Sequence, residues 1–326
     1  MKTTNHKITV LLGALTFVVA GATHAASIYV APDTAAYPNF YAPGNYYWGG
    51  SSFTSNIGVV TGNAFVEASW GVHSIHITNA QYSFNGGTAV TIDQTKAWDQ
   101  ASSFGGAWSG FGGPGAGVYS LSGASTLTGT ASGVSTIRVT AITGTIVKQA
   151  DQSALNPSWI TPATVGVSTP GGDGYRYAVG AGSQYYYYAP GLTGNYSLDV
   201  SWGIGNTTGV TANWYLDPNG TGNVGDYISL LTGINTGLFS DGVNRTTLPD
   251  NSPIYGGTYW GQWSGFKDAA DVTLNANSRI VYENPSFASL AGTVSDLQLT
   301  PVPEPATMGL LSLSLSALLL MNRRRS

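Results

Sequence analysis

Histidine and cysteine most often bind metals or carry nucleophilic catalysis, and this chain of 326 residues has few of them. It contains no cysteine, which excludes disulfides, zinc–thiolate sites and thiol nucleophiles. Of its four histidines, only His73 and His76 lie beyond the first 25 residues. They are three residues apart in a predicted strand, so we expect them to face opposite sides, one buried and one exposed. This spacing does not indicate a metal site or a serine hydrolase.

Carboxylates are the next candidates for catalysis. Glu67 and Asp199 occupy matching positions in two similar segments, FVEASW and SLDVSW, and we predict that both point outward from equivalent strands. A glycosidase needs two carboxylates about 5–10 Å apart across a cleft, and the linear sequence identifies no such pair. Arg176, between Tyr175 and Tyr177, leaves open a lyase that uses tyrosine and arginine. We predict a non-enzymatic protein, with a polysaccharide-processing enzyme as the weaker alternative.

The segment DPNGTGNVGD, residues 217–226, has the polar spacing that calcium loops use. Asp217, Asn219 and Thr221 stand at alternate positions, and a glycine follows where a sharp turn is needed. An isoleucine replaces the bidentate acid of an EF-hand-like loop, and Asp226 could substitute for that acid only with altered geometry. Calcium binding by these four residues is one interpretation, and a polar Gly/Asn turn is the other. We expect no other cofactor.

Tyrosine-rich segments offer a different chemistry. YPNFYAPGNYYW at 37–48 and YRYAVGAGSQYYYYAP at 175–190 are rich in tyrosine and flank Pro-Gly turns. Aromatic rings with a polar rim suit the flat C–H faces of sugars, and alternate rings on a strand lie about 6–7 Å apart. We predict glycan contacts by these rings, against the alternative that they fill the core or a joint between domains. The candidates are Tyr46, Tyr47, Trp48, Tyr185, Tyr186, Tyr187 and Tyr188.

These residues belong to a tandem duplication. TGNAFVEASWG at 61–71 aligns with TGNYSLDVSWG at 193–203, an offset of 132. AWSGF at 107–111 aligns with QWSGF at 262–266, an offset of 155. The second copy therefore carries an insertion of 23 residues between these two motifs.

Composition places both copies in the all-β class. Glycine, serine, threonine and asparagine are abundant, aromatics reach 12%, and glutamate and lysine are scarce, as is typical of short strands joined by tight turns. Segments such as FVEASW alternate apolar and polar residues, as half-buried strands do. We predict two tandem antiparallel β-sandwiches, repeat 1 at 26–150 and repeat 2 at 151–301, with Trp70 and Trp202 buried at equivalent positions.

The strands that end in Ser-Trp, the segment VTIDQ at 90–94 and the later tryptophan resemble the golvesin/xanthan-lyase carbohydrate-binding-like domain. The resemblance covers residues 37–142 and 175–299. It implies a jelly-roll-like β-sandwich, of a kind often appended to secreted enzymes and surface proteins. In the second copy DYISLL at 226–231 replaces VTIDQT, so the Asp-Gln pair is lost there.

Both ends of the chain are hydrophobic. The first 25 residues have a basic start, an apolar run and small residues before Ala25, which is the layout of a cleaved secretory signal peptide. Residues 306–321 form an apolar segment, about 24 Å long as a helix, and therefore a marginal single transmembrane span. The arginines that follow, Arg323, Arg324 and Arg325, would stay in the cytoplasm.

The last segment, residues 302–326, resembles the PEP-CTERM sorting signal. Its three parts occur in order: the motif VPEPAT, a short apolar helix and a terminal arginine cluster. The resemblance implies that an exosortase, a membrane protease-transpeptidase, recognises Pro303, Glu304 and Pro305. It also implies a transient stay in the inner membrane, followed by release to the cell surface or the exopolysaccharide matrix of a biofilm.

The charge of the body narrows its partners. Residues 26–302 carry 15 acidic and seven basic side chains, a net charge of −8, so we expect neither nucleic acid nor anionic lipid as a partner. With the sorting signal, this predicts an exported structural or adhesive protein whose partners are the exosortase and exopolysaccharide or surface glycans. A purely structural surface spacer is the main alternative.

Overall fold

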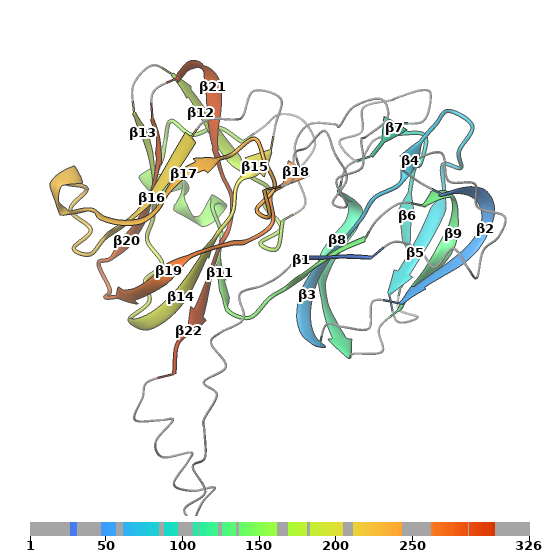
Figure 1. The fold of residues 1–326 in the computed structure, drawn as a ribbon, viewed down its shortest axis with the longest axis horizontal. Helices are drawn as coiled ribbons and strands as arrows, with labels where there is room; N and C mark the ends of the chain where they lie inside the picture. The colour runs from blue at the N-terminus through green and yellow to red at the C-terminus, as the bar shows by residue number, and fades with distance from the viewer. Residues whose placement is uncertain are drawn as a thin grey trace, which may run out of the picture.

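The computed structural model describes residues 27–30, 47–56, 61–84, 88–96, 107–109, 111–122, 126–134, 137–161, 169–180, 183–204, 211–242, 262–285 and 287–303. Their structure is almost entirely antiparallel β, which confirms the predicted fold class. Figure 1 shows two β units side by side, repeat 1 on the right and repeat 2 on the left. The predicted signal peptide and transmembrane segment lie outside these residues. No helix within the described ranges is long and apolar enough to cross a bilayer.

Repeat 1 contains two four-stranded antiparallel sheets and a short two-stranded ribbon. Its strands are β1 (Ser27–Val30), β2 (Tyr47–Asn56), β3 (Thr61–Ala68), β4 (Gly71–Val72), β5 (Ala80–Phe84), β6 (Val90–Ile92), β7 (Ala107–Trp108), β8 (Gly112–Ser122), β9 (Thr126–Val134) and β10 (Ile137–Ala141). The sheet orders are β1-β10-β3-β8 and β2-β9-β5-β6, and β4 pairs with β7. Strands β5 and β6 are antiparallel neighbours, as the Asn-Gly-Gly sequence between them favours.

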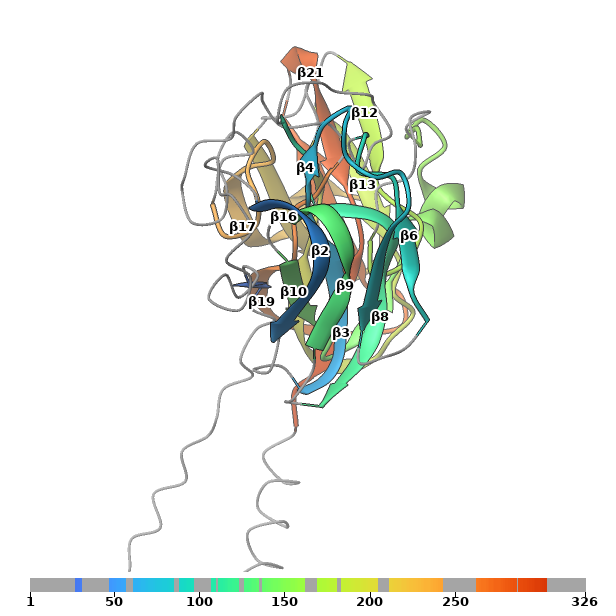
Figure 2. The same cartoon turned by 90° about the vertical axis from the view of Figure 1, so that its right-hand side faces the viewer.

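The two sheets of repeat 1 enclose its core, because residues of one parity on each strand point between them. On β3 these are Ala64, Val66 and Ala68, and on β5 they are Tyr82 and Phe84, all buried in one apolar cluster. In Figure 2, β2 and β9 lie in front of β3 and β10, as the two layers of a sandwich. Strand β5 alternates buried and half-buried residues. The second half of β3, where the sequence predicted a half-buried strand, is instead buried on both faces.

Repeat 2 contains the same two sheets. Its elements are β11 (Thr145–Val147), β12 (Arg176–Gly180), β13 (Gln184–Tyr188), β14 (Gly194–Val200), β15 (Gly203–Ile204), β16 (Thr211–Asp217), β17 (Ile228–Asn235), β18 (Gln262–Trp263), β19 (Lys267–Leu274), β20 (Arg279–Asn284), β21 (Phe287–Val294) and β22 (Leu297–Pro301), with the 3₁₀ helices η2 (Ala150–Leu155) and η3 (Val224–Asp226). The orders β11-β22-β14-β19 and β13-β20-β16-β17 match repeat 1 strand for strand, and β15–β18 matches β4–β7. The pair β12–β21 corresponds to the first part of β2–β9, because Arg176 pairs with Val294 as Tyr47 pairs with Val134.

Trp70 and Trp202 occupy the same environment, as the duplication predicts. Each is 1% exposed just beyond the end of its strand. The backbone N–H of Trp70 donates to Ser109 Oγ at 2.8 Å, and that of Trp202 donates to Ser264 Oγ at 2.9 Å. Both indole N–H groups donate to a backbone carbonyl at 2.9 Å. The Ser-Trp-Gly and Trp-Ser-Gly motifs of each repeat therefore hold one another in place.

The chain passes from repeat 1 to repeat 2 at residues 142–144. Strand β11 pairs with β22 and holds the edge position in repeat 2 that β1 holds in repeat 1. Residues 145–147, which the sequence prediction assigned to repeat 1, thus complete a sheet of repeat 2. A Cβ on Gly144 would collide with the carbonyl of Leu299, so this close passage requires glycine.

Glu67 and Asp199 are buried, so the prediction that they point into solvent was wrong. Their exposed fractions are 0% and 2%. They do face away from the sandwich core. This outer face is covered, however, by side chains at the contact between the two repeats, which we call the joint. Glu67 lies opposite Arg138 on β10, and Asp199 lies opposite Gln298 on β22. The duplicated position therefore serves the joint between the repeats.

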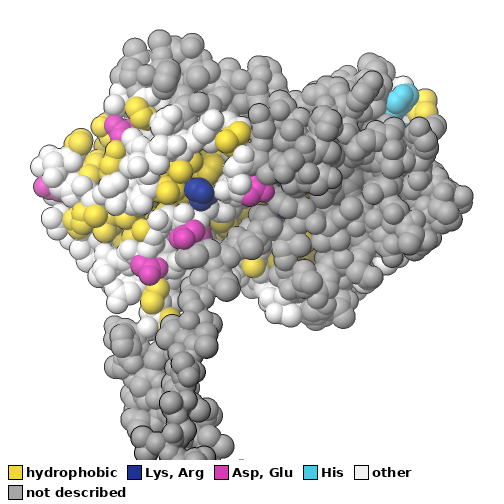
Figure 3. Space-filling view, in the orientation of Figure 1, with side chains coloured by type: hydrophobic (Ala, Val, Ile, Leu, Met, Phe, Trp, Pro, Cys, Tyr) yellow, Lys and Arg dark blue, Asp and Glu magenta, His cyan; other side chains and the backbone are white. Residues whose placement is uncertain are grey.

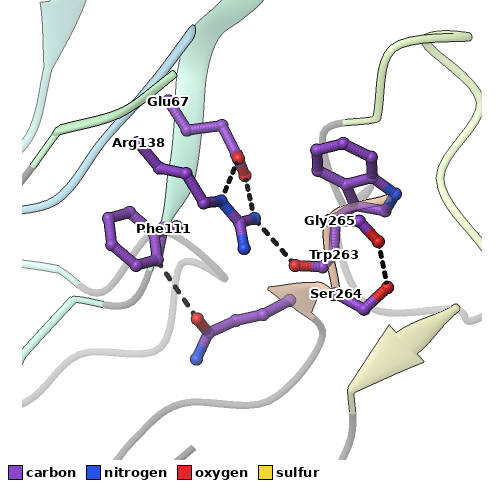
Figure 4. Close-up of polar contacts among 7 residues, drawn as sticks. Glu67, Phe111, Arg138, Trp263, Ser264 and Gly265 are labelled. Carbon is purple, nitrogen blue, oxygen red and sulfur yellow. Dashed lines mark hydrogen bonds and ion pairs between the residues drawn. The ribbon is translucent and has the colours of Figure 1, made fainter. Parts of the chain in front are cut away.

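Arg138 is the centre of this joint. It makes a bidentate ion pair with Glu67, at 2.5 and 2.8 Å, and its Nη2 donates to the backbone carbonyl of Trp263 in repeat 2 at 2.7 Å (Figure 4). Its guanidinium carbon lies 4.8 Å from the ring centre of Phe111 and 5.2 Å from those of Phe239 and Trp263. Aromatic faces stabilise the buried cation, so repeat 2 completes the environment of a charge carried by repeat 1.

In repeat 2 the matching pair carries a neutral partner. Gln298 Nε2 donates to Asp199 Oδ2 at 2.9 Å. Gln298 Oε1 accepts the backbone N–H of Thr143, in the passage between the repeats, at 3.0 Å. An amide can both donate and accept, and so it connects the carboxylate to the linker without a second charge.

Candidate functional site

The outer face of the sheet β13-β20-β16-β17 carries a cluster of aromatic and polar side chains. We call this cluster the tyrosine face, and it comprises Tyr185, Tyr187, Tyr215, Tyr227, Asn213 and Glu283. Alternation along β13 decides which tyrosines reach it. Tyr186 and Tyr188 are fully buried, and so they are not available for the glycan contact that the sequence suggested. Tyr185 and Tyr187 are partly exposed. In Figure 3, hydrophobic side chains, tyrosine included, are spread over the visible surface of repeat 2.

The rings of the tyrosine face adjoin one another. The centroids of Tyr185 and Tyr187 lie 6.3 Å apart with their planes inclined by 25°, close to the spacing expected from two strand rises. The ring of Tyr227 stands edge-on to Tyr185 at 6.3 Å and lies 5.7 Å from Tyr215. The guanidinium carbon of Arg279 lies 5.9 Å from the ring centre of Tyr187. Rings from β13, β16 and the segment after η3 thus form one surface.

Glu283 accepts hydrogen bonds from three other side chains of the tyrosine face. The donors are the hydroxyl of Tyr185 at 3.2 Å, the amide of Asn213 at 3.0 Å and the hydroxyl of Tyr215 at 2.8 Å. Burial would raise the pKa of Glu283, but these donors outweigh it and hold the pKa below the usual value. Burial and the bond to Glu283 raise the pKa of Tyr215 to about 12. The face therefore presents neutral phenols around one ionised carboxylate.

Side chains from residues 149–160 cover the free edge of β13. Asn156 donates from Nδ2 to the carbonyl of Tyr187 and accepts the N–H of Tyr187 at Oδ1, both at 2.9 Å. The indole N–H of Trp159 donates to the carbonyl of Tyr185 at 2.9 Å. These side chains take the place of a neighbouring strand, which fixes the tyrosine strand and blocks further strand pairing there. The sequence did not predict η2, which carries part of this segment.

Repeat 1 presents a different surface at the equivalent positions. Tyr82 and Trp214 correspond at the offset of 132, and the strand registers around them match the remaining residues. The equivalent pairs are Ser52 and Tyr185, Thr54 and Tyr187, Gln81 and Asn213, Ser83 and Tyr215, and Thr130 and Glu283. Ser52, Thr54 and Thr130 are exposed. The described part of this face in repeat 1 is thus small and polar where repeat 2 is aromatic.

The other predicted aromatic segment is described only in part. Tyr46 lies outside the described residues, and the side chains of Tyr47 and Trp48 do as well. The backbone of Tyr47 and Trp48 begins β2 and pairs with the end of β9. Glycan contact by these three residues stays a prediction.

The loop proposed for calcium closes on itself. Asp217 is fully buried, and its two oxygens accept the backbone N–H groups of Thr221 at 3.3 Å and Gly222 at 2.8 Å. Thr221 Oγ1 donates to Asp226 at 3.1 Å, and Asn219 is exposed. These contacts favour the interpretation as a polar turn. Within the described ranges, no group of three or more histidine, cysteine, aspartate or glutamate side chains is arranged so that it could hold a metal ion.

His73 and His76 lie in a turn, not on a strand, so the prediction of opposite faces was wrong. Strand β4 ends at Val72, and the N–H of His76 donates to the carbonyl of His73 at 3.0 Å. The rings are 5.7 Å apart. His76 is buried, with Nδ1 at 2.8 Å from the carbonyl of Gly71, and burial lowers its pKa. His73 is half-buried, so the structure confirms the predicted buried histidine but not a fully exposed one.

Sequence reasoning did not find Tyr215, Tyr227 and Glu283. Each stands alone in its segment, without the tyrosine run that marks β13. Tyr215 lies between two buried residues of β16, so alternation alone could have placed it on the outer face. Glu283 is identified only by strand pairing, because β20 lies between β13 and β16.

Comparison with protein families locates the sorting signal. The PEP-CTERM protein-sorting motif matches residues 301–325, which confirms the predicted resemblance. The motif is a recognition signal for an exosortase and indicates an exported surface protein that this enzyme processes. Pro303 is exposed just beyond β22. The other motif residues, Glu304, Pro305, Arg323, Arg324 and Arg325, lie outside the described residues.

Similarity of the body to known proteins is distant. The chain is similar to Paenibacillus xanthan lyase at 15% identity and a TM-score of 0.31, over 86% of this chain and 25% of the lyase. It therefore spans a quarter of the length of that protein. It is also similar to the plant receptor-like kinase FER at 10% identity and a TM-score of 0.23, over 89% of this chain and 91% of the other. No curated protein matches. These values carry no argument about function.

Proposed function

We propose that this protein is a non-enzymatic component of the cell surface or the exopolysaccharide matrix, and that it binds a neutral polysaccharide on the tyrosine face of repeat 2. The sorting motif supports export and surface delivery. The observation that carries the binding proposal is the pair Tyr185 and Tyr187, partly exposed, nearly parallel and 6.3 Å apart on a strand fixed at both edges.

The chemistry of the tyrosine face suits sugars. A pyranose ring has flat C–H surfaces that pack on aromatic rings, and hydroxyl groups that need polar partners at the rim. Two parallel rings in a row suit successive units of an extended chain. The tyrosine hydroxyls and the Asn213 amide supply the polar rim, while Glu283 holds three of these side chains in place before any ligand binds.

The charge of the tyrosine face favours a neutral ligand. Glu283 is an ionised carboxylate at its centre, and the body carries a net charge of −8, so both disfavour a polyuronate. The same residue argues against catalysis. A general acid needs a raised pKa, whereas the hydrogen bonds to Glu283 lower its pKa.

Affinity electrophoresis tests the proposal. The protein is run in gels that contain the exopolysaccharide of its source organism, a neutral β-glucan or alginate. Wild type should be retarded by the first or the second, and not by alginate, and the double variant Tyr185→Ala/Tyr187→Ala should lose this retardation. The matched control is Ser52→Ala/Thr54→Ala in repeat 1, which should migrate as wild type does. Unretarded wild type in every gel would favour the surface spacer instead.

Processing is tested separately by intact-mass analysis of the mature protein. The arginine cluster and the motif Pro303-Glu304-Pro305 predict that residues 306–326 are removed from the mature form. A mature protein that still carries these residues in wild-type cells would contradict exosortase processing. Release of sugars from the polysaccharide by the purified protein would favour an enzyme over a binding module.

A further inference from the structure

Two aspartates from distant parts of repeat 2 meet beside β12. Asp173 lies in the loop 169–174, within the segment between β11 and β12 that contains η2, and Asp296 lies in the turn between β21 and β22. Asp296 is fully buried, whereas Asp173 is partly exposed. Their carboxyl groups are close enough to hydrogen-bond when one of them carries a proton. The fold thus brings two acidic groups together at the border between core and solvent.

The loop is shaped around these carboxyl groups. The backbone N–H of Gly171 donates to Asp296 Oδ2 at 2.6 Å, and the N–H of Ala150 donates to Asp173 Oδ2 at 2.9 Å. A Cβ on Gly171 would lie 2.7 Å from Asp296 Oδ1, so only glycine permits this approach. Gly172, at a φ of +81°, makes the turn that brings the loop back to Asp173.

One buried oxygen of this pair has no partner. Asp296 Oδ1 makes no hydrogen bond, and within the described part of the chain no ion pair involves Asp173 or Asp296. Arg176, the nearby cation, directs its Nε to Gln149 Oε1 at 2.6 Å instead. The hydroxyls of Tyr186 and Tyr188 also donate elsewhere, to backbone carbonyls. Two groups that only accept hydrogen bonds when ionised therefore face each other, and a cation or a proton must lie between them.

We propose that Asp173 and Asp296 form a calcium site that binds one ion per chain. The donor atoms are all oxygen, which is what calcium selects, and carboxylates bind it through one or both oxygens. Each carboxylate accepts a backbone N–H and keeps lone pairs for a metal. Thr169 Oγ1, 3.5 Å from Asp173 Oδ1, is a further oxygen at the site, and Asp173 itself is partly exposed to solvent.

Calcium fits better than the alternatives. The divalent charge of calcium cancels the charges of both carboxylates, and Asp296 Oδ1 offers an oxygen that has no hydrogen-bond partner. Magnesium demands near-ideal octahedral geometry and gives up its water reluctantly, which a two-carboxylate site with backbone-bound oxygens does not favour. An exported protein also meets the calcium concentrations at which extracellular modules bind, about 10⁻⁴–10⁻³ M.

The site belongs to repeat 2 alone. Ile137 on β10 and Leu297 on β22 occupy equivalent positions in the two repeats. The residue before Ile137 is Thr136, so the sequence of repeat 1 has a threonine where repeat 2 has Asp296. The proposed ion would tie the segment that begins at Gln149 to the turn before β22. The carbonyl of Gln149 accepts the hydroxyl of Tyr186 at 2.5 Å, so this segment also borders the tyrosine strand. The proposal does not depend on glycan binding.

Calorimetry and thermal unfolding of the full chain in detergent test the proposal. Protein treated with EDTA is titrated with calcium chloride, and with magnesium chloride for comparison. We expect one calcium per chain with a Kd of about 10⁻⁴–10⁻³ M, a higher Tm with calcium, and at least tenfold weaker magnesium binding. Asp296→Asn should remove calcium binding. In EDTA it should unfold at or above the wild-type Tm, because it removes the repulsion between two carboxylates.

A matched variant separates this site from the other acidic loop. Asp226→Asn alters the loop 217–226 and should bind calcium as wild type does. Loss of binding in Asp226→Asn with retention in Asp296→Asn would overturn the proposal. Absence of binding and of any Tm change in wild type at 10 mM calcium, a concentration at least about tenfold above the expected Kd, would also overturn it and leave a shared proton between the two groups.

Discussion

At positions where repeat 1 exposes Ser52 and Thr54, repeat 2 exposes Tyr185 and Tyr187, on strands with the same register. The inward positions differ much less, since Trp70 and Trp202 have the same burial and the same hydrogen bonds. Packing constrains the residues between the sheets, because any change there leaves a cavity or a clash. The outer face has no such constraint. It can therefore diverge after duplication and acquire a binding function in one copy.

The joint shows a second kind of divergence. Repeat 1 places Arg138 opposite Glu67, and repeat 2 places Gln298 opposite Asp199. Both pairs are buried, but only the first contains two full charges, and it needs aromatic rings from both repeats to surround the guanidinium. The two copies therefore contribute unequal halves to one joint and form an asymmetric pair.

The largest effects should come from the equivalent tryptophans. Trp70→Ala and Trp202→Ala should each lower the free energy of unfolding by roughly 3–5 kcal/mol, because each leaves a cavity and removes the hydrogen bond of the indole N–H. Urea unfolding followed by circular dichroism measures both values. Val118→Ala, at a site 46% exposed, should change stability by less than about 0.5 kcal/mol. A large loss in one repeat and none in the other would break the equivalence.

The joint should respond more strongly in repeat 1 than in repeat 2. Glu67→Gln leaves Arg138 buried without a counter-charge and should cost about 3 kcal/mol. Asp199→Asn keeps a neutral hydrogen-bond acceptor for Gln298 and should cost about 1 kcal/mol. Both are measured by urea unfolding. The double variant Glu67→Gln/Arg138→Met should recover part of the loss, and equal costs at the two sites would contradict the asymmetry.

The tyrosine face should make repeat 2 the more acid-sensitive copy through Glu283. Because the pKa of Glu283 is lowered on folding, its contribution is fully present above the unfolded pKa, near 4.3, and is lost as pH falls through the folded value. Between pH 5 and pH 3, wild type should lose about 1 kcal/mol more stability than Glu283→Gln. Urea unfolding across this range measures the difference. Parallel pH profiles for the two proteins would show that the carboxylate does not organise the face.

The smallest effect is a transfer of function between the copies, and it rests on the proposed polysaccharide binding. A triple variant introduces the side chains of the tyrosine face at the equivalent positions of repeat 1: Ser52→Tyr, Thr54→Tyr and Thr130→Glu. Each aromatic contact contributes about 0.5–1.5 kcal/mol, so the two added rings should tighten binding by at least about fivefold in affinity electrophoresis. Combined with Tyr185→Ala/Tyr187→Ala, it should restore retardation. Failure to restore it would show that the flanking segment of repeat 2, and not the rings alone, makes the site.

The sequence by itself determined the all-β class, the duplication, the sorting signal and the alternation of the tyrosines in β13. Each follows from local spacing or from similarity between segments, which need no knowledge of strand pairing. The tertiary structure decided which tyrosines face outward and that Glu283 lies beside Tyr185. It also decided that Glu67 is buried and that Asp173 meets Asp296. These contacts join residues far apart in the chain, and their cause is the register between strands together with the covering of an outer face by the neighbouring repeat. The periodicity of residues along one strand specifies neither the register of that strand with its neighbours nor which outer face the other repeat covers.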